Sequence, residues 1–251
     1  MSIKELNKNP LSQITENVYL SGVTGVTNVD LMRSAGITHV LNLAAGDASH
    51  LTYDLGHGPA IADDDVSQNT SFIKTSKVST LGGDMVDNAQ VLIVRREYLR
   101  DSDDQSLLSY LDDLVDFVSK AVSVGGKVVV HCMAGVSRSA SVVLAYLVRE
   151  RAMSLREAHD HVIACRPVIR PNMGFWAALV EYELNIRGEN SVEVLDYAAG
   201  SVPSLDSYQK EMQLRLRLGW MDHLFYNLAV QFFILIAQMM GSLWIFSDYS
   251  K

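Results

Sequence analysis

The sequence predicts an α/β domain with a mainly parallel central sheet, because segments typical of strands alternate with segments typical of helices. A run of three valines, Val128 to Val130, is typical of a buried strand, and the apolar segment 140–148 that follows it is typical of a buried helix. At 251 residues the chain is long enough for one full domain and a tail. We therefore expect one α/β core, organised around residues 126–140, which contain the strand, the loop and the start of the helix.

The first part of the chain supplies two expected strands and one short helix. Residues 12–22 alternate in the manner of an edge strand, and residues 37–44 form the next expected strand. Between them, Thr27 and Asp30 are typical of a helix-capping pair, and Gly36 is expected to end the short helix that follows.

Residues 45–89 show the weakest periodicity of apolar residues, so they predict no regular helix or strand. They are rich in Gly, Asp, Ser and Thr and contain only brief apolar runs. This composition is typical of a long loop or a partly disordered insertion. We interpret the run Asp63 to Asp65 as a solvated charge cluster rather than a metal site.

In the second half of the chain, segments typical of strands and of helices again alternate clearly. Residues 91–94 and 98–99 predict a strand, and apolar residues at helical spacing from Leu107 to Val122 predict a helix. A capping box then predicts a helix over 154–164, and a further helix is expected over 172–186.

Residues 131–139 read His-Cys-Met-Ala-Gly-Val-Ser-Arg-Ser and lie between an expected strand and an expected helix. Such a turn directs backbone N–H groups into one concavity, and the positive end of the helix dipole lies behind it, so the loop is suited to bind a dianion such as phosphate. The same field favours a thiolate, which makes Cys132 a candidate nucleophile. Arg138 offers planar donors that can clamp two phosphate oxygens in the transition state, and Ser139 can donate its hydroxyl to the departing sulfur.

This loop resembles that of the cysteine-based protein phosphatases, and within them the small, atypical, single-domain members of the dual-specificity branch. The resemblance covers most of residues 12–187 and includes Val-Tyr-Leu-Ser-Gly (18–22), Ile-Thr-His-Val-Leu-Asn (37–42) and the segment from Arg166 to Glu183. It implies a protein phosphatase that hydrolyses phosphotyrosine and phosphoserine or phosphothreonine in phosphorylated proteins. The resemblance also implies that the reaction proceeds through a phosphocysteine intermediate, without a metal or another cofactor.

The resemblance also implies roles for individual residues. Asp101 is the candidate general acid, preferred to Asp103 and Asp104 because its distance before the Leu107 helix matches the family's acid best. His131 is expected to orient the loop and to support the thiolate rather than to touch the substrate. The expected phosphate-binding residues are Met133, Ala134, Gly135, Val136, Ser137 and Arg138.

Two other functions stay open at this point. A phosphoinositide phosphatase would share the chemistry, although residues 133–137 contain none of the lysines that a polyphosphorylated headgroup favours. A phosphoprotein-binding module with weak or no catalysis would normally lack the cysteine, the arginine or the acid. Candidates for all three are present here.

The amino-acid composition limits which molecules the protein can bind and in which cellular compartment it can work. The chain has 21 Lys and Arg against 29 Asp and Glu, a net charge of −8, and no basic stripe, which argues against a nucleic acid partner. Its two cysteines are too few for a disulfide framework, and a reactive thiol requires a reducing compartment. The first thirty residues show no signal peptide pattern. We therefore expect a cytoplasmic domain.

We divide the chain into an N-terminal extension (1–11), a phosphatase domain (12–187), a linker or tail (188–223) and an apolar segment (224–247). The last segment has no charged side chain and is long enough to cross a hydrocarbon core of about 30 Å. Two interpretations remain. The segment is a membrane anchor that holds the domain on the cytosolic face, or it is an apolar helix that docks on the phosphatase domain.

Overall fold

The computed structural model of the chain describes residues 9–44, 46, 51, 53, 60–61, 70–74, 91–197, 200–206, 208–214 and 216–218. The chain divides into two compact units, Met1–Glu193 and Val194–Lys251. Three of the regions considered above, residues 1–8, Asp63 to Asp65 and the apolar segment 224–247, lie outside the described residues.

The described residues of the first unit form a seven-stranded sheet with the strand order β1-β2-β7-β3-β6-β5-β4. The four central strands, β2, β7, β3 and β6, are parallel, and the outer strands pair antiparallel. The predicted α/β fold with a mainly parallel central sheet is therefore confirmed. The strands are β1 Leu11–Gln13, β2 Val18–Ser21, β3 His39–Asn42, β4 Ala60–Ile61, β5 Thr70–Lys74, β6 Val91–Arg96 and β7 Val128–His131.

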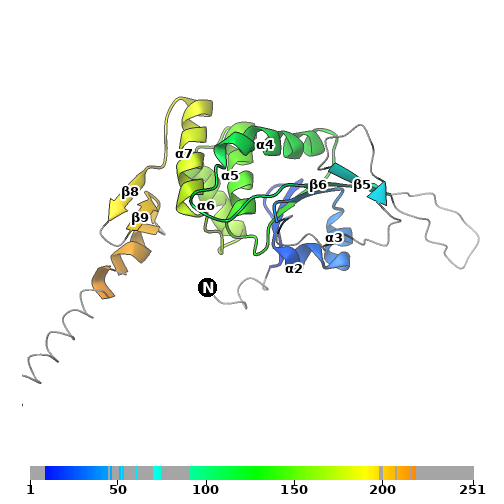
Figure 1. Ribbon diagram of the computed structural model, residues 1–251, viewed down its shortest axis with the longest axis horizontal. Coiled ribbons are helices and arrows are strands. Elements are labelled where there is room, and N and C mark those ends of the chain that lie inside the picture. Colours follow the sequence, from blue (N-terminus) through cyan, green and yellow to red (C-terminus); the bar gives the residue numbers. More distant parts are fainter. Residues whose placement is uncertain are drawn as a thin grey trace, which may run out of the picture. The chain divides into compact units, whose positions relative to one another are not determined.

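Helices cover both faces of this sheet (Figure 1). Helices α2 and α3 lie on one face and α4 to α7 on the other, with α5 in contact with α4, α6, α7 and β7. Every residue of α5 from Arg138 to Val148 is buried as a result. The helices are α2 Val23–Val26, α3 Val29–Ala35, α4 Leu108–Ser123, α5 Arg138–Glu150, α6 Leu155–Cys165 and α7 Met173–Arg187.

The valine run of β7 reflects its central position. Val129 belongs to a buried cluster on the side of α2 and α3, together with Val26, Met32 and Val40. Because successive strand residues point to opposite faces, Val128 and Val130 lie on the side of α5. A strand covered on both faces needs apolar side chains on both, which explains the absence of alternation.

The predicted edge strand over residues 12–22 is wrong in its extent. The segment forms two strands, and β1 is the edge while β2 lies inside the sheet between β1 and β7. The expected cap of the next helix is also displaced by one residue. The side chain of Asn28 accepts from the N–H of Leu31, and Thr27 donates its hydroxyl to the carbonyl oxygen of Val23 in α2. Gly36 ends α3 in the left-handed region with φ 71°, as predicted.

Two corrections concern the region around β6. The loop predicted over residues 45–89 contains β4 and β5, which extend the sheet antiparallel from β6. Short strands at a sheet edge carry little pattern, which is why composition alone suggested a loop. Tyr98 and Leu99 do not continue a strand, since β6 ends at Arg96 and Tyr98 forms only an isolated bridge with Ala44.

The predicted helices of the second half are confirmed. Ser154 and Glu157 form both hydrogen bonds of a capping box at the start of α6. Asn172 caps α7 by accepting from the N–H of Phe175.

The second unit begins with an antiparallel hairpin of β8 Val194–Tyr197 and β9 Gly200–Pro203, and residues 208–214 are helical. The expected linker or tail over 188–223 therefore contains regular structure. Within the described part of the chain, no helix combines the length and the apolar character needed to span a membrane.

Candidate active site

The candidate phosphate loop, residues 132–138, lies where the carboxyl end of β7 meets the start of α5. Ser137 occupies the N-cap position of α5, and Arg138 is the first residue of the helix. The carboxyl edge of a parallel sheet is where ligands of open α/β folds bind. The strand and the helix predicted from the sequence therefore place the loop at this edge.

The loop turns its carbonyl groups outward. Four consecutive carbonyl oxygens, of residues 133–136, each accept a hydrogen bond from a donor outside the loop. The N–H of Val23 binds Met133 O at 2.9 Å, and the N–H of Arg170 binds Val136 O at 2.7 Å. The Arg166 side chain binds the two carbonyls between them, at 3.0 and 2.7 Å. Since the C=O and N–H groups of a peptide point in opposite directions, the N–H groups of these peptides are directed inward, a geometry suited to a concavity that binds an anion.

Two glycines allow the loop to lie directly on the end of β2. Gly135 has φ 68°, and a Cβ atom added to it would lie 2.4 Å from the carbonyl carbon of Ser21. A Cβ on Gly22 would lie 2.8 Å from the carbonyl carbon of Ala134. Larger residues at these positions would push the loop away from the sheet.

Cys132 and Ser139 meet at the base of this concavity. Cys132 is 1 % exposed, and its Sγ lies 3.2 Å from the hydroxyl oxygen of Ser139. The N–H of Gly135 also donates to Sγ, at 3.3 Å. When the sulfur is a thiolate, both groups act as donors and stabilise its negative charge.

Arg138 is held by two backbone carbonyl groups. Its Nη1 donates to the carbonyl oxygens of Leu43 at 3.4 Å and Leu99 at 3.0 Å, which follow β3 and β6. Its Nε lies 3.6 Å from a carboxylate oxygen of Asp101. The guanidinium group is thus oriented by the segments that follow β3 and β6 at the carboxyl edge of the sheet.

The three aspartates considered as general acid have different surroundings. Asp101, with its side chain 36 % exposed, pairs with Arg138 and accepts a hydrogen bond from the Asn172 amide at 3.0 Å. Asp103 instead accepts from backbone N–H groups at the start of α7, and Asp104 pairs with Arg100 on the surface at 3.2 Å. Of the three, Asp101 is the one that contacts a residue of the phosphate loop.

His131 is buried directly before the nucleophile and uses both ring nitrogens. Nδ1 lies 3.3 Å from the carbonyl oxygen of Cys132, which can only accept, so Nδ1 carries the proton and Nε2 accepts from the Tyr53 hydroxyl at 2.6 Å. Burial is the main cause that lowers the pKa of His131 to about 4. The bond to Cys132 opposes the shift, and the positive charges of Arg96 and Arg138 add to it. His131 is therefore neutral near pH 7.

Arg166 supports the phosphate loop from behind. It is 3 % exposed, and besides the two loop carbonyls it donates to the carbonyl oxygen of Asn9 and the hydroxyl of Ser12. Burial lowers the pKa of Arg166, and the negative charge of Cys132 opposes this shift. Its charge thus contributes to the positive field at the sulfur.

Some of these contacts have no signal in the sequence. Tyr53 lies in the weakly patterned stretch, where nothing marks it as a partner of His131. Arg166 and Asn172 belong to the segment that carries the family resemblance, and Asn172 begins a predicted helix, but nothing in the sequence assigns a contact to either. The sequence makes Asp103 a candidate acid, whereas the structure shows it at the N-terminus of a helix that begins seventy residues later in the chain.

Comparison with known proteins identifies the family. The family model "Dual specificity phosphatase, catalytic domain" matches residues 18–185, which is more than half of the chain. The chain belongs to this family. Dual specificity protein phosphatase 18 of Pongo abelii is 33 % identical over 208 residues, covering 83 % of this chain and 90 % of that protein, and the human protein of the same name matches equally. The predicted enzyme class, a cysteine-dependent dual-specificity protein phosphatase, is confirmed.

Solved structures of phosphatases share the fold. Human DUSP28 superimposes with a TM-score of 0.51 at 25 % identity, covering 71 % of this chain and 95 % of that one. A mouse putative dual specificity phosphatase complexed with zinc tungstate gives a TM-score of 0.51 at 26 % identity, covering 71 % and 89 %. A human tyrosine phosphatase-like serine/threonine/tyrosine-interacting protein gives a TM-score of 0.52 at 22 % identity, which indicates the fold alone.

Proposed function

We propose that this phosphatase hydrolyses phosphoproteins in two steps, with Cys132 as nucleophile and Asp101 as general acid and base. The Cys132 thiolate attacks phosphorus, the bond to the leaving oxygen breaks, and Asp101 gives its proton to that oxygen. The product is a phosphocysteine and the dephosphorylated side chain. Asp101 then takes a proton from a water molecule, which attacks phosphorus, and the sulfur leaves as a thiolate that accepts a hydrogen bond from Ser139.

The observation that carries this proposal is the outward orientation of the four carbonyl groups of residues 133–136. It leaves the inner surface of the loop with donors only, beside a buried sulfur and at the positive end of α5. Such a site suits the three equatorial oxygens of a transferring phosphoryl group, with Arg138 as the clamp. The mouse relative is complexed with zinc tungstate, and tungstate, like phosphate, is an oxyanion.

A phosphatase assay on the purified chain tests the proposal. An activated aryl phosphate and a panel of phosphotyrosine, phosphoserine and phosphothreonine peptides are measured with and without EDTA. We expect turnover that EDTA leaves unchanged and that Cys132→Ser abolishes, since a hydroxyl cannot replace the thiolate. The matched control is Cys165→Ser at the half-buried end of α6, which should retain activity.

The same assay separates the alternatives. More than a few per cent of activity in Cys132→Ser would show that the phosphocysteine mechanism is wrong. Faster turnover of a phosphoinositide than of every phosphopeptide would favour a lipid substrate. Binding of phosphopeptides without turnover would favour a binding module.

We further propose that the domain is cytoplasmic and that segment 224–247 tethers it to a membrane. This proposal rests on the apolar sequence of that segment and on Arg215 and Arg217 before it. Carbonate extraction of the full chain from cell membranes, compared with a chain that ends near Arg217, tests it. The full chain should remain in the membrane fraction and the shorter one should not. A full chain that stays soluble and monomeric without detergent would favour docking on the domain instead.

A further inference from the structure

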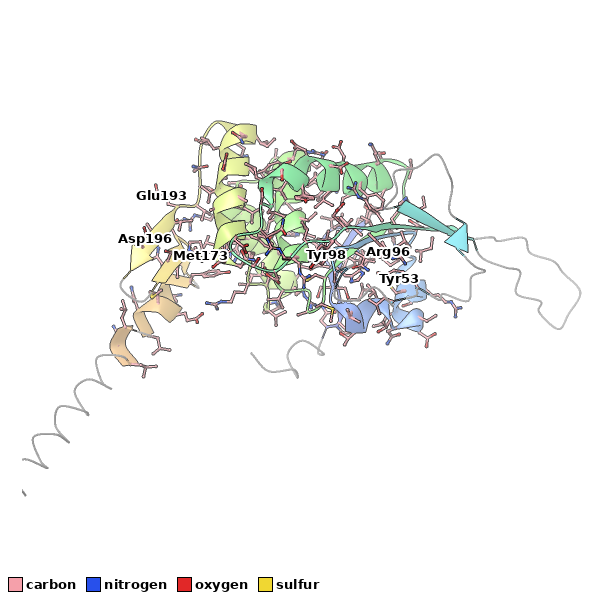
Figure 2. The ribbon with its side chains drawn as sticks, in the orientation of Figure 1. Tyr53, Arg96, Tyr98, Met173, Glu193 and Asp196 are labelled. Carbon is pink, nitrogen blue, oxygen red and sulfur yellow. The ribbon has the colours of Figure 1, made fainter. Side chains whose placement is uncertain are left out.

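The loop that carries Asp101, residues 100–106, is attached to the N-terminus of α7. We call it the acid loop. The Oδ1 atom of Asp103 accepts from the N–H groups of Met173 at 3.0 Å and Gly174 at 3.3 Å, and Figure 2 labels Met173 at this end of α7. The first N–H groups of a helix have no partner within the helix, so a carboxylate from elsewhere in the chain satisfies two of them here.

The same helix end also holds Asp101. Asn172 accepts from the N–H of Phe175 with its Oδ1 at 2.8 Å, which orients the amide, and its Nδ2 donates to Asp101 at 3.0 Å. Asp101 and Asp103 are therefore both bound at the start of α7. Asp103 binds the helix backbone, and Asp101 is directed toward Arg138.

Backbone packing reinforces this attachment. A Cβ atom on Gly174 would lie 2.1 Å from the carbonyl oxygen of Asp103, so the acid loop lies directly on the helix. The phosphate loop is attached at the same place, because the N–H of Asn172 donates to the hydroxyl oxygen of Ser137 at 3.2 Å. The start of α7 thus connects the loop that carries the acid to the loop that carries the nucleophile.

We propose that Asp103 is a positioning residue, which fixes the acid loop on α7 and so holds Asp101 at the correct distance from the leaving oxygen. The inference rests on the proposed role of Asp101 as general acid. It implies that the acid is in place before substrate binds. It also gives Asp103 a function that depends on its acceptor oxygen and not on its ability to give up a proton.

Leaving-group dependence tests this role. Phenyl phosphate needs a proton on its leaving oxygen, and an activated aryl phosphate such as 4-nitrophenyl phosphate needs it much less. We expect Asp103→Ala to lower kcat/KM for phenyl phosphate by about tenfold or more and for the activated ester by less than about threefold, because general acid catalysis contributes about 10²-fold or more. Asp103→Asn keeps the acceptor oxygen and should retain most of the activity on both substrates. The charge-matched control is Asp104→Asn at its exposed neighbour, which should match the wild type.

Two further variants show whether Asp103 acts through Asp101. In an Asp101→Asn background, Asp103→Ala should cause no additional loss, since the residue that it positions no longer donates a proton. Gly174→Ala removes no charge but displaces the acid loop, and it should give the same selective loss on phenyl phosphate. Thermal unfolding shows whether Asp103→Ala folds. If it does not fold, the two substrates are compared with Gly174→Ala instead.

Several results would overturn the inference. Equal losses in Asp103→Asn and Asp103→Ala would mean that the carboxyl group itself transfers the proton. Wild-type values for Asp103→Ala on both substrates, or additive losses in the double variant, would show that the residue does not position the acid. A wild-type chain without Cys132-dependent turnover would instead contradict the proposed function, so the two failures are distinguishable.

Discussion

The hydroxyl of Tyr53 donates a 2.6 Å hydrogen bond to Nε2 of His131, 78 positions away in the chain. Burial raises the pKa of Tyr53, so the hydroxyl keeps its proton and remains a donor at neutral pH. The guanidinium of Arg96 lies 5.5 Å from the centre of the Tyr53 ring, and Figure 2 labels both residues. The residue before the nucleophile is thus held by a side chain from the stretch between β3 and β6.

Tyr53→Phe removes only this hydroxyl and leaves Nε2 of His131 buried without its donor. We expect the free energy of unfolding to fall by about 1–3 kcal/mol, the cost of an unsatisfied buried polar group. We also expect kcat/KM to fall by roughly fivefold, which corresponds to about 1 kcal/mol of transition-state stabilisation. Urea unfolding and steady-state kinetics measure both, with Tyr110→Phe on α4 as the control. Unchanged stability and kinetics would contradict a role for the bond.

The lowered pKa of His131 predicts a loss of stability in mild acid. The unfolded chain binds a proton at this residue near pH 6.5, whereas the folded chain resists protonation until about pH 4, so stability falls between these values. Such a shift corresponds to about 3 kcal/mol at about 1.4 kcal/mol per pH unit. Burial also lowers the pKa of His39 and His159, which adds a loss of the same sign. Urea unfolding at pH 7, 5.5 and 4.5 should show the decline, and it should be smaller in His131→Asn. If the free energy of unfolding falls as steeply with pH in that variant as in the wild type, His131 is not the cause of the decline.

Arg166→Lys should loosen the phosphate loop. A single ammonium group cannot reach both Ala134 O and Gly135 O in the geometry of the guanidinium fork. We expect the inhibition constant of vanadate, a phosphate mimic, to rise by about tenfold, because hydrogen bonds of charged groups contribute about 1.5–3 kcal/mol each. Arg151→Lys, at an exposed residue after α5, is the control. Wild-type inhibition by vanadate in Arg166→Lys would exclude a supporting role for the fork.

The effect of Asp101→Asn on kcat/KM should depend on the leaving group of the substrate. The amide cannot give a proton to the leaving oxygen, so kcat/KM for phenyl phosphate should fall by about 10²-fold or more, as is typical of a lost general acid. An activated aryl phosphate should lose much less. Steady-state kinetics on the two esters measure the difference. An equal loss on both, or a larger loss from Asp103→Asn, would transfer the role of acid away from Asp101.

Local sequence determined the elements whose signals lie within a few neighbouring positions. The valines of β7 predicted a buried strand because both faces of that strand are covered. Ser154 and Glu157 predicted the start of α6 because a capping box spans four residues. The spacing of Cys132 and Arg138 predicted an anion site because Cys132 begins the loop and Arg138 begins the helix that follows it.

Tertiary structure decided the contacts between distant segments. Asp101, Asp103 and Asp104 are chemically alike, and only the approach of Asn172 and α7 directs Asp101 to Arg138 and Asp103 to the helix. The pairing of β5 with β6 and the bond from Tyr53 to His131 have no periodic signature in the sequence. The physical reason is that a hydrogen bond between residues tens of positions apart depends on where the packed sheet and helices bring their backbones together, and no local propensity encodes that position.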